Sequence, residues 1–212
     1  HYAYPTDFPD EVIEVMARQK KICRYLDIPF QHISDNQLSA MKRRHTKAQA
    51  IELVTKLRKA IPDIALRTTL LVGYPGESEE DFAELMQFVK DTKFDRLGVF
   101  AYSEEEGTYS ATRLKDDVEE EVKHERVDRI MRLQERISLE NNAKRVGQIM
   151  SVIIDRKEGD FYIGRSEYDS PEVDQEIVID SCGKRLYRGR FYDVKITDCE
   201  DYDLYASLVY VD

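Results

Sequence analysis

The first hundred residues alternate between a strand pattern and a helix pattern, and this alternation restricts the fold more than any other feature of the chain. Apolar and β-branched residues are concentrated in residues 25–30, 65–72 and 96–102. Between these runs apolar residues recur at helical spacing, and residues 2–4 indicate the end of an earlier strand. Strands that alternate with helices form parallel sheets, so this part is predicted to be α/β.

Local signals place three helix starts. Ser34 with Gln37, and Thr46 with Gln49, have the spacing of a capping box. Ser78 precedes three acidic residues, which suit the positive end of a helix dipole. We therefore expect helices to begin directly after these serine and threonine residues.

The second half of the chain has a different pattern. Residues 118–143 predict one long helix that links two domains. Short alternating β runs follow at residues 150–154, 161–164, 176–179 and 191–196, with glycines between them. This pattern predicts a small antiparallel β-barrel. We expect an α/β domain over residues 1–142 and a barrel domain over residues 143–212.

Charge and hydropathy exclude some classes of function. The chain has 32 Lys and Arg against 42 Asp and Glu, a net charge of −10, which argues against broad binding to a nucleic-acid backbone. Residues 145–212 hold 15 acidic and 9 basic side chains, so this domain would suit a basic partner. The sequence has neither a membrane-length apolar run nor a signal-peptide pattern, which predicts a cytoplasmic protein without a membrane partner. Because it opens on His1 and not on Met, we expect a fragment of a longer protein.

The three cysteines, Cys23, Cys182 and Cys199, lie far apart in the sequence and show no metal-ligand spacing. They predict buried thiols in a reducing compartment. The four histidines show no metal-ligand pattern either, and no spacing indicates a nucleophile beside a base. No metal site is predicted, and the catalytic residues stay unknown.

Each predicted strand of the α/β domain runs into a polar loop, at residues 31–35, 73–77 and 103–108. Ligands bind at the carboxyl ends of parallel strands, so these loops form the candidate site. The glycines of residues 73–77 would let the backbone approach a ligand, although a plain turn before a helix has the same pattern. Gln31 and His32 fit ligand contacts and loop-stabilising roles equally well.

Two charged features are open to more than one interpretation. Arg67 lies inside an apolar strand, where an unpaired charge is costly, so it either faces a polar barrel interior or pairs with a carboxylate. The acidic residues between positions 116 and 121 are typical of a solvated helix start.

Several ordered motifs resemble the radical S-adenosylmethionine methylthiotransferases, in the branch that modifies an aspartate of a small-subunit ribosomal protein. The matching segments are YAYP at residues 2–5, YLDIPFQHISD at 25–35, RTT at 67–69, VGYPGE at 72–77, FDRLGVF at 94–100 and YSEEEGT at 102–108. The resemblance continues through residues 133–138 into GRSEYDSPEVD at 164–174, which looks like the TRAM module of these enzymes. It covers essentially the whole chain.

The resemblance implies the carboxyl-terminal part of a partial (β/α) radical SAM barrel with parallel strands, followed by an OB-like TRAM barrel. It also implies an enzyme in which a reduced 4Fe-4S cluster cleaves S-adenosylmethionine. The resulting radical takes hydrogen from the aspartate β-carbon of ribosomal small-subunit protein twelve, and a second cluster serves the methylthio transfer. The cofactors supply this chemistry, and the protein positions them.

The positions of the family motifs indicate which residues are expected to form the site. Contacts to S-adenosylmethionine are expected from Gln31, Arg67, Gly73, Tyr74, Pro75, Gly76, Glu77, Tyr102 and Ser103. Contacts to the protein substrate are expected from Asp169, Glu172 and Asp174 of the TRAM module. The family's radical cluster needs a C-x₃-C-x₂-C run and its second cluster three further cysteines, and neither set occurs in this sequence. The fragment is therefore predicted to bind no cluster and to be inactive alone.

Two alternatives to a protein-modifying enzyme stay open. Transfer-RNA methylthiotransferases use the same two modules, but a polyanionic substrate favours Lys and Arg on the binding face. A non-catalytic module that only binds the ribosomal protein is the other alternative. Truncation would also expose the edge of the first barrel strand, which predicts possible self-association.

Overall fold

A computed structural model describes residues 2–209 of the chain. The described residues divide into two compact units: the chain up to residue 22 with residues 26–134, and residues 23–25 with the chain from residue 135 onward. No helix in the described range is both long and apolar enough to cross a membrane. The domain boundary predicted between residues 142 and 143 lies at the end of the linking helix and stays a prediction.

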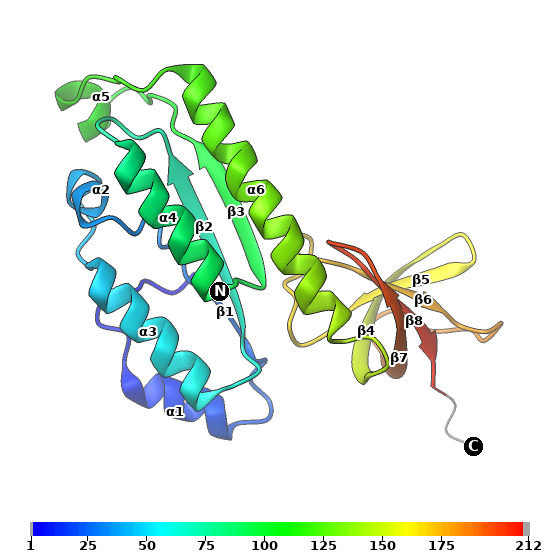
Figure 1. The fold of residues 1–212 in the computed structure, drawn as a ribbon. Helices are drawn as coiled ribbons and strands as arrows, with labels where there is room; N and C mark the ends of the chain where they lie inside the picture. Colours follow the sequence, from blue (N-terminus) through cyan, green and yellow to red (C-terminus); the bar gives the residue numbers. More distant parts are fainter. Residues whose placement is uncertain (1, 210–212) are drawn as a thin grey trace. The chain divides into compact units, whose positions relative to one another are not determined.

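The first unit contains a parallel three-stranded sheet in the order β1-β2-β3 (Figure 1). β1 is Tyr25–Asp27, β2 is Ala65–Val72 and β3 is Arg96–Ala101. β2 and β3 pair in parallel, with Arg67 beside Arg96 and Val72 beside Ala101. The helices of this unit are α1 (Asp10–Arg18), α2 (Asp35–Ala40), α3 (Lys47–Ala60), α4 (Glu79–Thr92) and α5 (Tyr109–Arg113). The predicted α/β class with parallel strands is confirmed.

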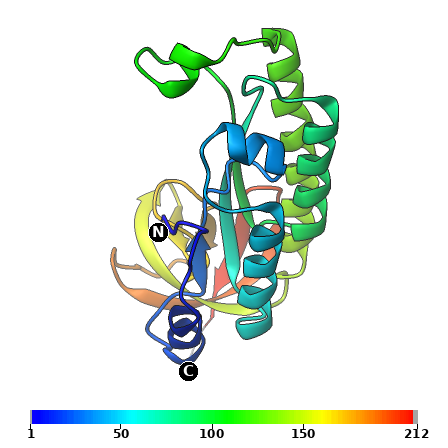
Figure 2. The same ribbon diagram turned by 90° about the vertical axis from the view of Figure 1, so that its left-hand side faces the viewer.

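The core of the first unit lies between the sheet and its helices. Alternate residues of β2 are buried, and α3 and α4 lie along one face of the sheet (Figure 2). Three phenylalanines contact one another edge to face or tilted, with Phe30 5.6 Å from Phe88 and 6.1 Å from Phe94 between ring centroids. These contacts join the segment after β1 to α4 and to the start of β3.

Two of the three predicted helix caps are confirmed. Thr46 and Gln49 form a complete capping box at the start of α3, and Ser78 forms one with Asp81 at the start of α4. α2 does begin after Ser34, but the Ser34 side chain does not cap it. Instead, Ser34 Oγ donates to the carboxylate of Asp81, which a local sequence pattern could not reveal.

The second unit is a closed barrel with the strand order β4-β5-β6-β8-β7. Its strands are β4 (Ile149–Glu158), β5 (Phe161–Arg165), β6 (Ile177–Asp180), β7 (Phe191–Cys199) and β8 (Leu204–Leu208). The predicted small barrel is confirmed, with two corrections. β8 was not expected, and it pairs in parallel with β6, so the barrel is not purely antiparallel. α6 (Glu120–Ala143) begins in the first unit and ends in the second.

Other expectations require correction. Residues 2–4 form no strand, although Ala3 N–H donates to Asp27 O at 2.8 Å. β1 ends before Pro29, whose nitrogen carries no hydrogen for a ladder bond. The cysteines are not buried, because Cys23 and Cys182 are exposed and Cys199 is half-buried.

Candidate functional site

The turn at residues 73–77 lies directly after β2, at the carboxyl end of the central strand. Gly73 has a φ of +72°, and a Cβ there would lie 2.2 Å from Lys123 Cγ. Gly76 has a φ of +79°, with nothing within 4 Å of the Cβ position. Both positions favour glycine by backbone conformation, and Gly73 is also required by close packing. The predicted turn is therefore held against the start of α6.

The Glu77 carboxylate is fully buried and joins three parts of the first unit. It accepts a hydrogen bond from Gly73 N–H, lies 3.3 Å from His32 Nε2, and lies 3.3 Å from Arg126 Nη1. His32 Nδ1 accepts from Ser34 N–H at 3.1 Å. Glu77 therefore ties the turn to the loop after β1 and to α6, and its carboxylate is occupied within the protein.

Three backbone N–H groups of the turn are also occupied. Gly73 N–H donates to Glu77, Gly76 N–H donates to Asp117 Oδ1 at 2.7 Å, and Glu77 N–H donates to Tyr74 O at 3.0 Å. A ligand at this turn would not find these three donors free. Tyr74 O and Glu77 O also accept hydrogen bonds within the protein, so a ligand would have to donate to the other carbonyl oxygens of the turn.

Two buried cations at the start of α6, Lys123 and Arg126, contact the turn, and sequence reasoning missed both. Lys123 has 1% side-chain exposure and contacts Asp116 and Glu120 at 2.6 Å each. Burial alone would lower the pKa of Lys123, but hydrogen bonds to these two carboxylates raise it. Arg126 donates to Glu77 O at 3.2 Å and contacts Glu79 Oε1 at 2.5 Å. The hydrogen bond from Arg126 lowers the pKa of Glu79.

The acidic segment before α6 is therefore more than a solvated helix start. Asp116 and Glu120 neutralise a buried lysine, and Asp117 binds the turn directly. One signal was present in the sequence: Lys123 and Arg126 occupy the helix face that also carries the buried Ile130. A cation on an apolar helix face requires a carboxylate partner, and the acidic run supplies one.

Tyr102 and Ser103 follow β3 at the same end of the sheet. Tyr102 is 6% exposed, and its N–H donates to Val72 O at 2.8 Å. Its ring lies 5.0 Å from the ring of Tyr74. The Tyr102 hydroxyl is buried and forms no hydrogen bond with any described residue, so it is a polar group without a partner beside Tyr74. Ser103 is exposed.

Gln31 pairs with Leu70 near the end of β2, whereas Arg67 lies deeper on the sheet. Gln31 N–H donates to Thr69 O, and Leu71 N–H donates to Gln31 O, so Gln31 is joined to β2 by its backbone. Arg67 Nη1 lies 3.0 Å from Asp27 Oδ2, which confirms the interpretation that Arg67 pairs with a carboxylate. At about 3.3 Å per residue along a strand, Arg67 is about 16 Å from the end of β2. The structure therefore gathers the turn, Tyr102 and Ser103, but not Arg67.

The described residues do not fit an iron–sulfur cluster. Nowhere in the described part of the chain do three His, Cys, Asp or Glu side chains gather as metal ligands would. The unpartnered Tyr102 hydroxyl is compatible with a polar organic ligand such as S-adenosylmethionine, which could supply its missing hydrogen bond.

The three acidic residues expected to bind substrate differ in exposure. Asp169 is 8% exposed and accepts from Ser166 Oγ at 2.6 Å. Asp174 is half-buried and accepts from Ser170 N–H at 2.8 Å. Glu172 is exposed, with a φ of +69°. Two of the three carboxylates thus help to fold their own loop, and Glu172 is the one presented to solvent.

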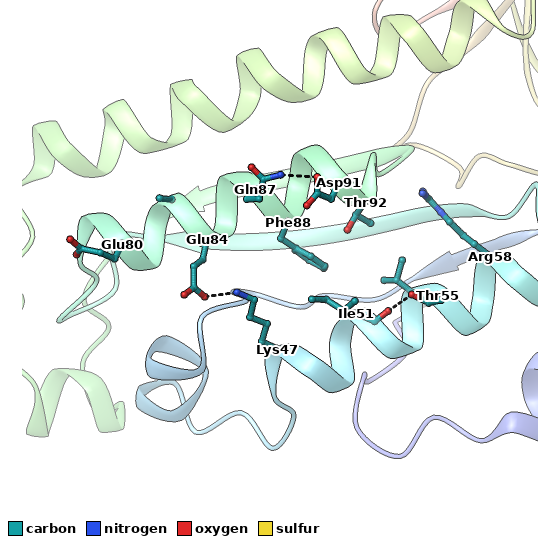
Figure 3. Close-up of a pocket in the computed structure, with 12 residues that line it drawn as sticks. Lys47, Ile51, Thr55, Arg58, Glu80, Glu84, Gln87, Phe88, Asp91 and Thr92 are labelled. Carbon is teal, nitrogen blue, oxygen red and sulfur yellow. Dashed lines mark hydrogen bonds and ion pairs between the residues drawn. The ribbon is translucent and has the colours of Figure 1, made fainter.

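A groove of about 870 Å³ lies between α3 and α4, away from these residues (Figure 3). Lys47 of α3 reaches Glu84 of α4, with Nζ and Oε2 3.1 Å apart. Apolar side chains such as Ile51 and Phe88 line the groove between the helices. None of the sequence-predicted site residues lines it, so it is separate from the candidate cofactor site.

Two family models match the chain. The radical SAM superfamily model matches residues 3–89, which include β1, β2 and the turn at residues 73–77. The TRAM domain model matches residues 146–209, which contain the closed barrel. The two models thus correspond to the α/β part and the barrel part of the chain.

Curated relatives match nearly the whole chain. A protein of Phocaeicola vulgatus named ribosomal protein uS12 methylthiotransferase RimO is 53% identical over 209 residues, 99% of this chain and 48% of the relative. Proteins with the same name from Bacteroides thetaiotaomicron and Christiangramia forsetii are 52% and 53% identical, over 99% and 98% of the chain. The chain spans about half the length of the curated relatives it matches.

A solved structure supports the fold. Coproporphyrinogen III oxidase (HemN) from Escherichia coli, a radical SAM enzyme, superposes with a TM-score of 0.54 over 78% of this chain and 45% of that one. The identity is only 15%, so this likeness concerns the fold alone. The curated relatives and the two domain matches support one conclusion: the chain belongs to the radical S-adenosylmethionine methylthiotransferase family and carries its TRAM domain.

Proposed function

We propose that this chain is part of a cytoplasmic enzyme that adds a methylthio group to the β-carbon of an aspartate in ribosomal protein uS12. The observation that carries the proposal is its 53% identity, over 99% of its length, to a relative named for action on uS12. In the whole enzyme, S-adenosylmethionine and two 4Fe-4S clusters would supply the radical chemistry. The described residues would bind and orient S-adenosylmethionine, and the TRAM domain would recognise the protein substrate.

Within the cofactor site, the buried Glu77–Arg126–His32 network would fix the shape of the turn before the cofactor arrives. The turn carbonyls and the Tyr102 hydroxyl would then meet polar groups of S-adenosylmethionine. A preorganised site loses less entropy on binding than a mobile loop. Gln31 and Ser103 would contribute from the neighbouring strands, whereas Arg67 would act deeper on the sheet, next to Asp27.

The acidic TRAM domain supports a protein substrate over an RNA substrate. With 15 acidic and 9 basic side chains in residues 145–212, it would repel a polyanion and attract a basic protein. Calorimetric titration of the chain with purified uS12 and with transfer RNA tests this choice. We expect salt-sensitive binding of uS12 and no binding of transfer RNA. Tight, salt-sensitive binding of transfer RNA would instead favour the RNA-modifying alternative.

The enzyme assignment needs a test in a full-length protein. Replacing the matching half of the Phocaeicola vulgatus relative with this chain gives a chimera whose other half is unchanged. We expect the chimera, after anaerobic cluster reconstitution, to add one methylthio group to uS12, detected by mass spectrometry of the modified peptide. A chimera that binds uS12 and both clusters but never modifies uS12 would favour the non-catalytic binding module.

The isolated chain is proposed to bind no cluster and to be inactive. Iron and sulfide analysis after anaerobic reconstitution of the chain should give no stoichiometric cluster, with the chimera as the positive control. A stoichiometric 4Fe-4S spectrum from the isolated chain would overturn this part of the proposal. Light scattering over a range of concentrations tests the proposed self-association, and a strict monomer at high concentration would contradict it.

A further inference from the structure

The barrel unit contains a second pocket, of about 490 Å³, that the cofactor site does not use. It lies where β4 and β5 meet the loop over residues 170–176. Its lining includes carboxylates, guanidinium groups and the amide side chain of Gln175. A concave pocket with several converging polar groups is a candidate ligand site, and its chemistry depends on which of those groups lack partners.

Two of the pocket's cations are already paired with carboxylates. Arg156 holds Glu176 through two hydrogen bonds, with Nη1–Oε1 at 2.7 Å and Nη2–Oε2 at 2.6 Å. Arg165 donates to Asp155. Bidentate and charge-assisted pairs of this kind fix side-chain positions. These four residues therefore form the walls of the pocket, and their charges cancel.

Two hydrogen-bond acceptors of the pocket have no partner among the described residues. Gln175 is 8% exposed, and its Oε1 accepts no hydrogen bond. Glu172 is exposed, lines the same pocket, and forms no ion pair or hydrogen bond within the described part of the chain. Buried polar groups in native proteins normally have partners. The pocket therefore offers two acceptors without partners, one of which carries a negative charge, beside one exposed cation, Arg188.

We propose that this pocket binds a cationic side chain, arginine or lysine, of a basic protein partner. Glu172 would supply the opposite charge, and the buried amide oxygen of Gln175 would accept an N–H hydrogen bond from the incoming group. The excess of 15 acidic over 9 basic side chains in residues 145–212 is complementary to such a partner. Binding of the cation stands alone, whereas identifying the partner as uS12 rests on the proposed function.

Arg188 allows the experiment to identify the charge of the ligand. It is exposed and lines the same pocket, and no carboxylate among the described residues pairs with it. A cationic ligand is repelled by Arg188 and attracted by Glu172, while an anionic ligand experiences the reverse. Substituting these two residues must therefore change affinity in opposite directions, and the directions identify the charge of the ligand.

The direct experiment titrates the isotope-labelled chain with N-acetyl-arginine amide, N-acetyl-lysine amide and inorganic phosphate, monitored by NMR. We expect saturable shifts at Gly164, Glu172 and the Gln175 side-chain amide with either cation, and none there with phosphate. Glu172→Gln should weaken arginine-amide binding about threefold, the size typical of a partly exposed ion pair. Arg188→Gln should strengthen it, and added salt should reduce the effects of both substitutions.

Gln175→Met tests the buried acceptor while keeping a similar side-chain volume. It should weaken binding of both cations, and its NMR spectrum reports whether the barrel is still folded. If this variant fails to fold, the opposite changes in arginine-amide affinity expected for Glu172→Gln and Arg188→Gln still show whether the pocket prefers a cation. Absence of shifts with both cations, or phosphate binding that Arg188→Gln removes, would overturn the proposal.

Titration with uS12 separates this proposal from the proposed function. If both hold, uS12 binds the chain, and Glu172→Gln weakens that binding. If uS12 binds and Glu172→Gln has no effect, the identification of uS12 as the partner of this pocket is overturned, while the proposed function stands. If the amides bind as expected but uS12 does not bind, the cation site is supported and the substrate assignment fails.

Discussion

The two loops that carry the candidate residues place their charges in opposite environments. At the turn of residues 73–77, Glu77 and Arg126 are 0% and 5% exposed, and each lies in a network that reaches other elements. In the barrel, Arg156 and Glu176 are 44% and 42% exposed. Buried charges are costly when a partner is lost, whereas exposed pairs contribute little. The comparison indicates that the charges at the turn are part of the buried structure, whereas the paired charges of the barrel lie at its solvent-exposed surface.

The largest expected effect comes from removing the buried cation of the turn. Arg126→Met leaves the Glu77 carboxylate buried without its guanidinium, and the free energy of unfolding should fall by about 3–5 kcal/mol. Urea denaturation measures this change. The matched control is Arg132→Met on the exposed part of α6, which should change stability by less than about 0.5 kcal/mol. Equal effects of the two substitutions would remove the distinction between buried and exposed charges.

A pair of glycine substitutions tests the close packing at the turn. Gly73→Ala and Gly76→Ala both place alanine at positive φ, which costs about 1–2 kcal/mol. Gly73→Ala also forces a Cβ to within 2.2 Å of Lys123 Cγ, whereas Gly76→Ala meets nothing within 4 Å. We expect Gly73→Ala to be more destabilising than Gly76→Ala by a further ~1–3 kcal/mol. Thermal melting of both variants gives the comparison, and equal melting temperatures would show that Lys123 does not pack on Gly73.

Low pH should reduce the folding stability of the first unit, because it protonates Asp81. Burial alone would raise the pKa of Asp81, but hydrogen bonds from Ser34, Ser78 and Asn36 lower it to about 2. Because the folded pKa lies below the ordinary aspartate value of 3.8, this carboxylate stabilises the fold above about pH 4. That contribution is lost as the pH falls toward 2.

Asp81→Asn tests the acid sensitivity. The variant should lose about 1–3 kcal/mol of stability at neutral pH, and its remaining stability should depend less on pH between about 4 and 2. Asp128→Asn, at an exposed position on α6, is the control. Stability curves for the parent chain and the two variants give the measurement, and parallel curves for the parent and Asp81→Asn would contradict the role given to this carboxylate.

The smallest effect is expected in the barrel. Glu176→Gln breaks the exposed fork with Arg156, and the free energy of unfolding should change by less than about 1 kcal/mol. A double-mutant cycle with Arg156→Gln isolates the pair energy. A coupling energy as large as that of a buried pair would mean that the barrel loop is built as rigidly as the turn.

Local sequence signals predicted the parts of the fold that depend on neighbouring residues. The capping boxes at Thr46 and Ser78, the strand at β2 and the turn glycines were all predictable, because their causes lie within a few residues. The pairing of Glu77 with Arg126 joins residues 49 positions apart, and no local pattern contains it. β8 was missed because its short run has weak alternation, and it pairs with β6 across a long connection.

The candidate site shows the same division. Family motifs indicated the turn together with Tyr102 and Ser103, and the structure brings these residues to one end of the sheet. The motifs could not indicate that Glu77 faces inward or that Asp169 folds its own loop, since both depend on tertiary contacts. Exposure therefore separates Glu172 from its two acidic neighbours in a way that charge counts cannot.

The most direct test of the cofactor site is an NMR titration of the labelled chain with S-adenosylmethionine. If the site lies at the carboxyl end of the sheet, saturable shifts should occur at Gln31, Tyr102, Ser103 and residues 73–77, and Gly73→Ala should weaken them. Absence of shifts at these positions, or shifts confined to the groove between α3 and α4, would contradict the proposed site.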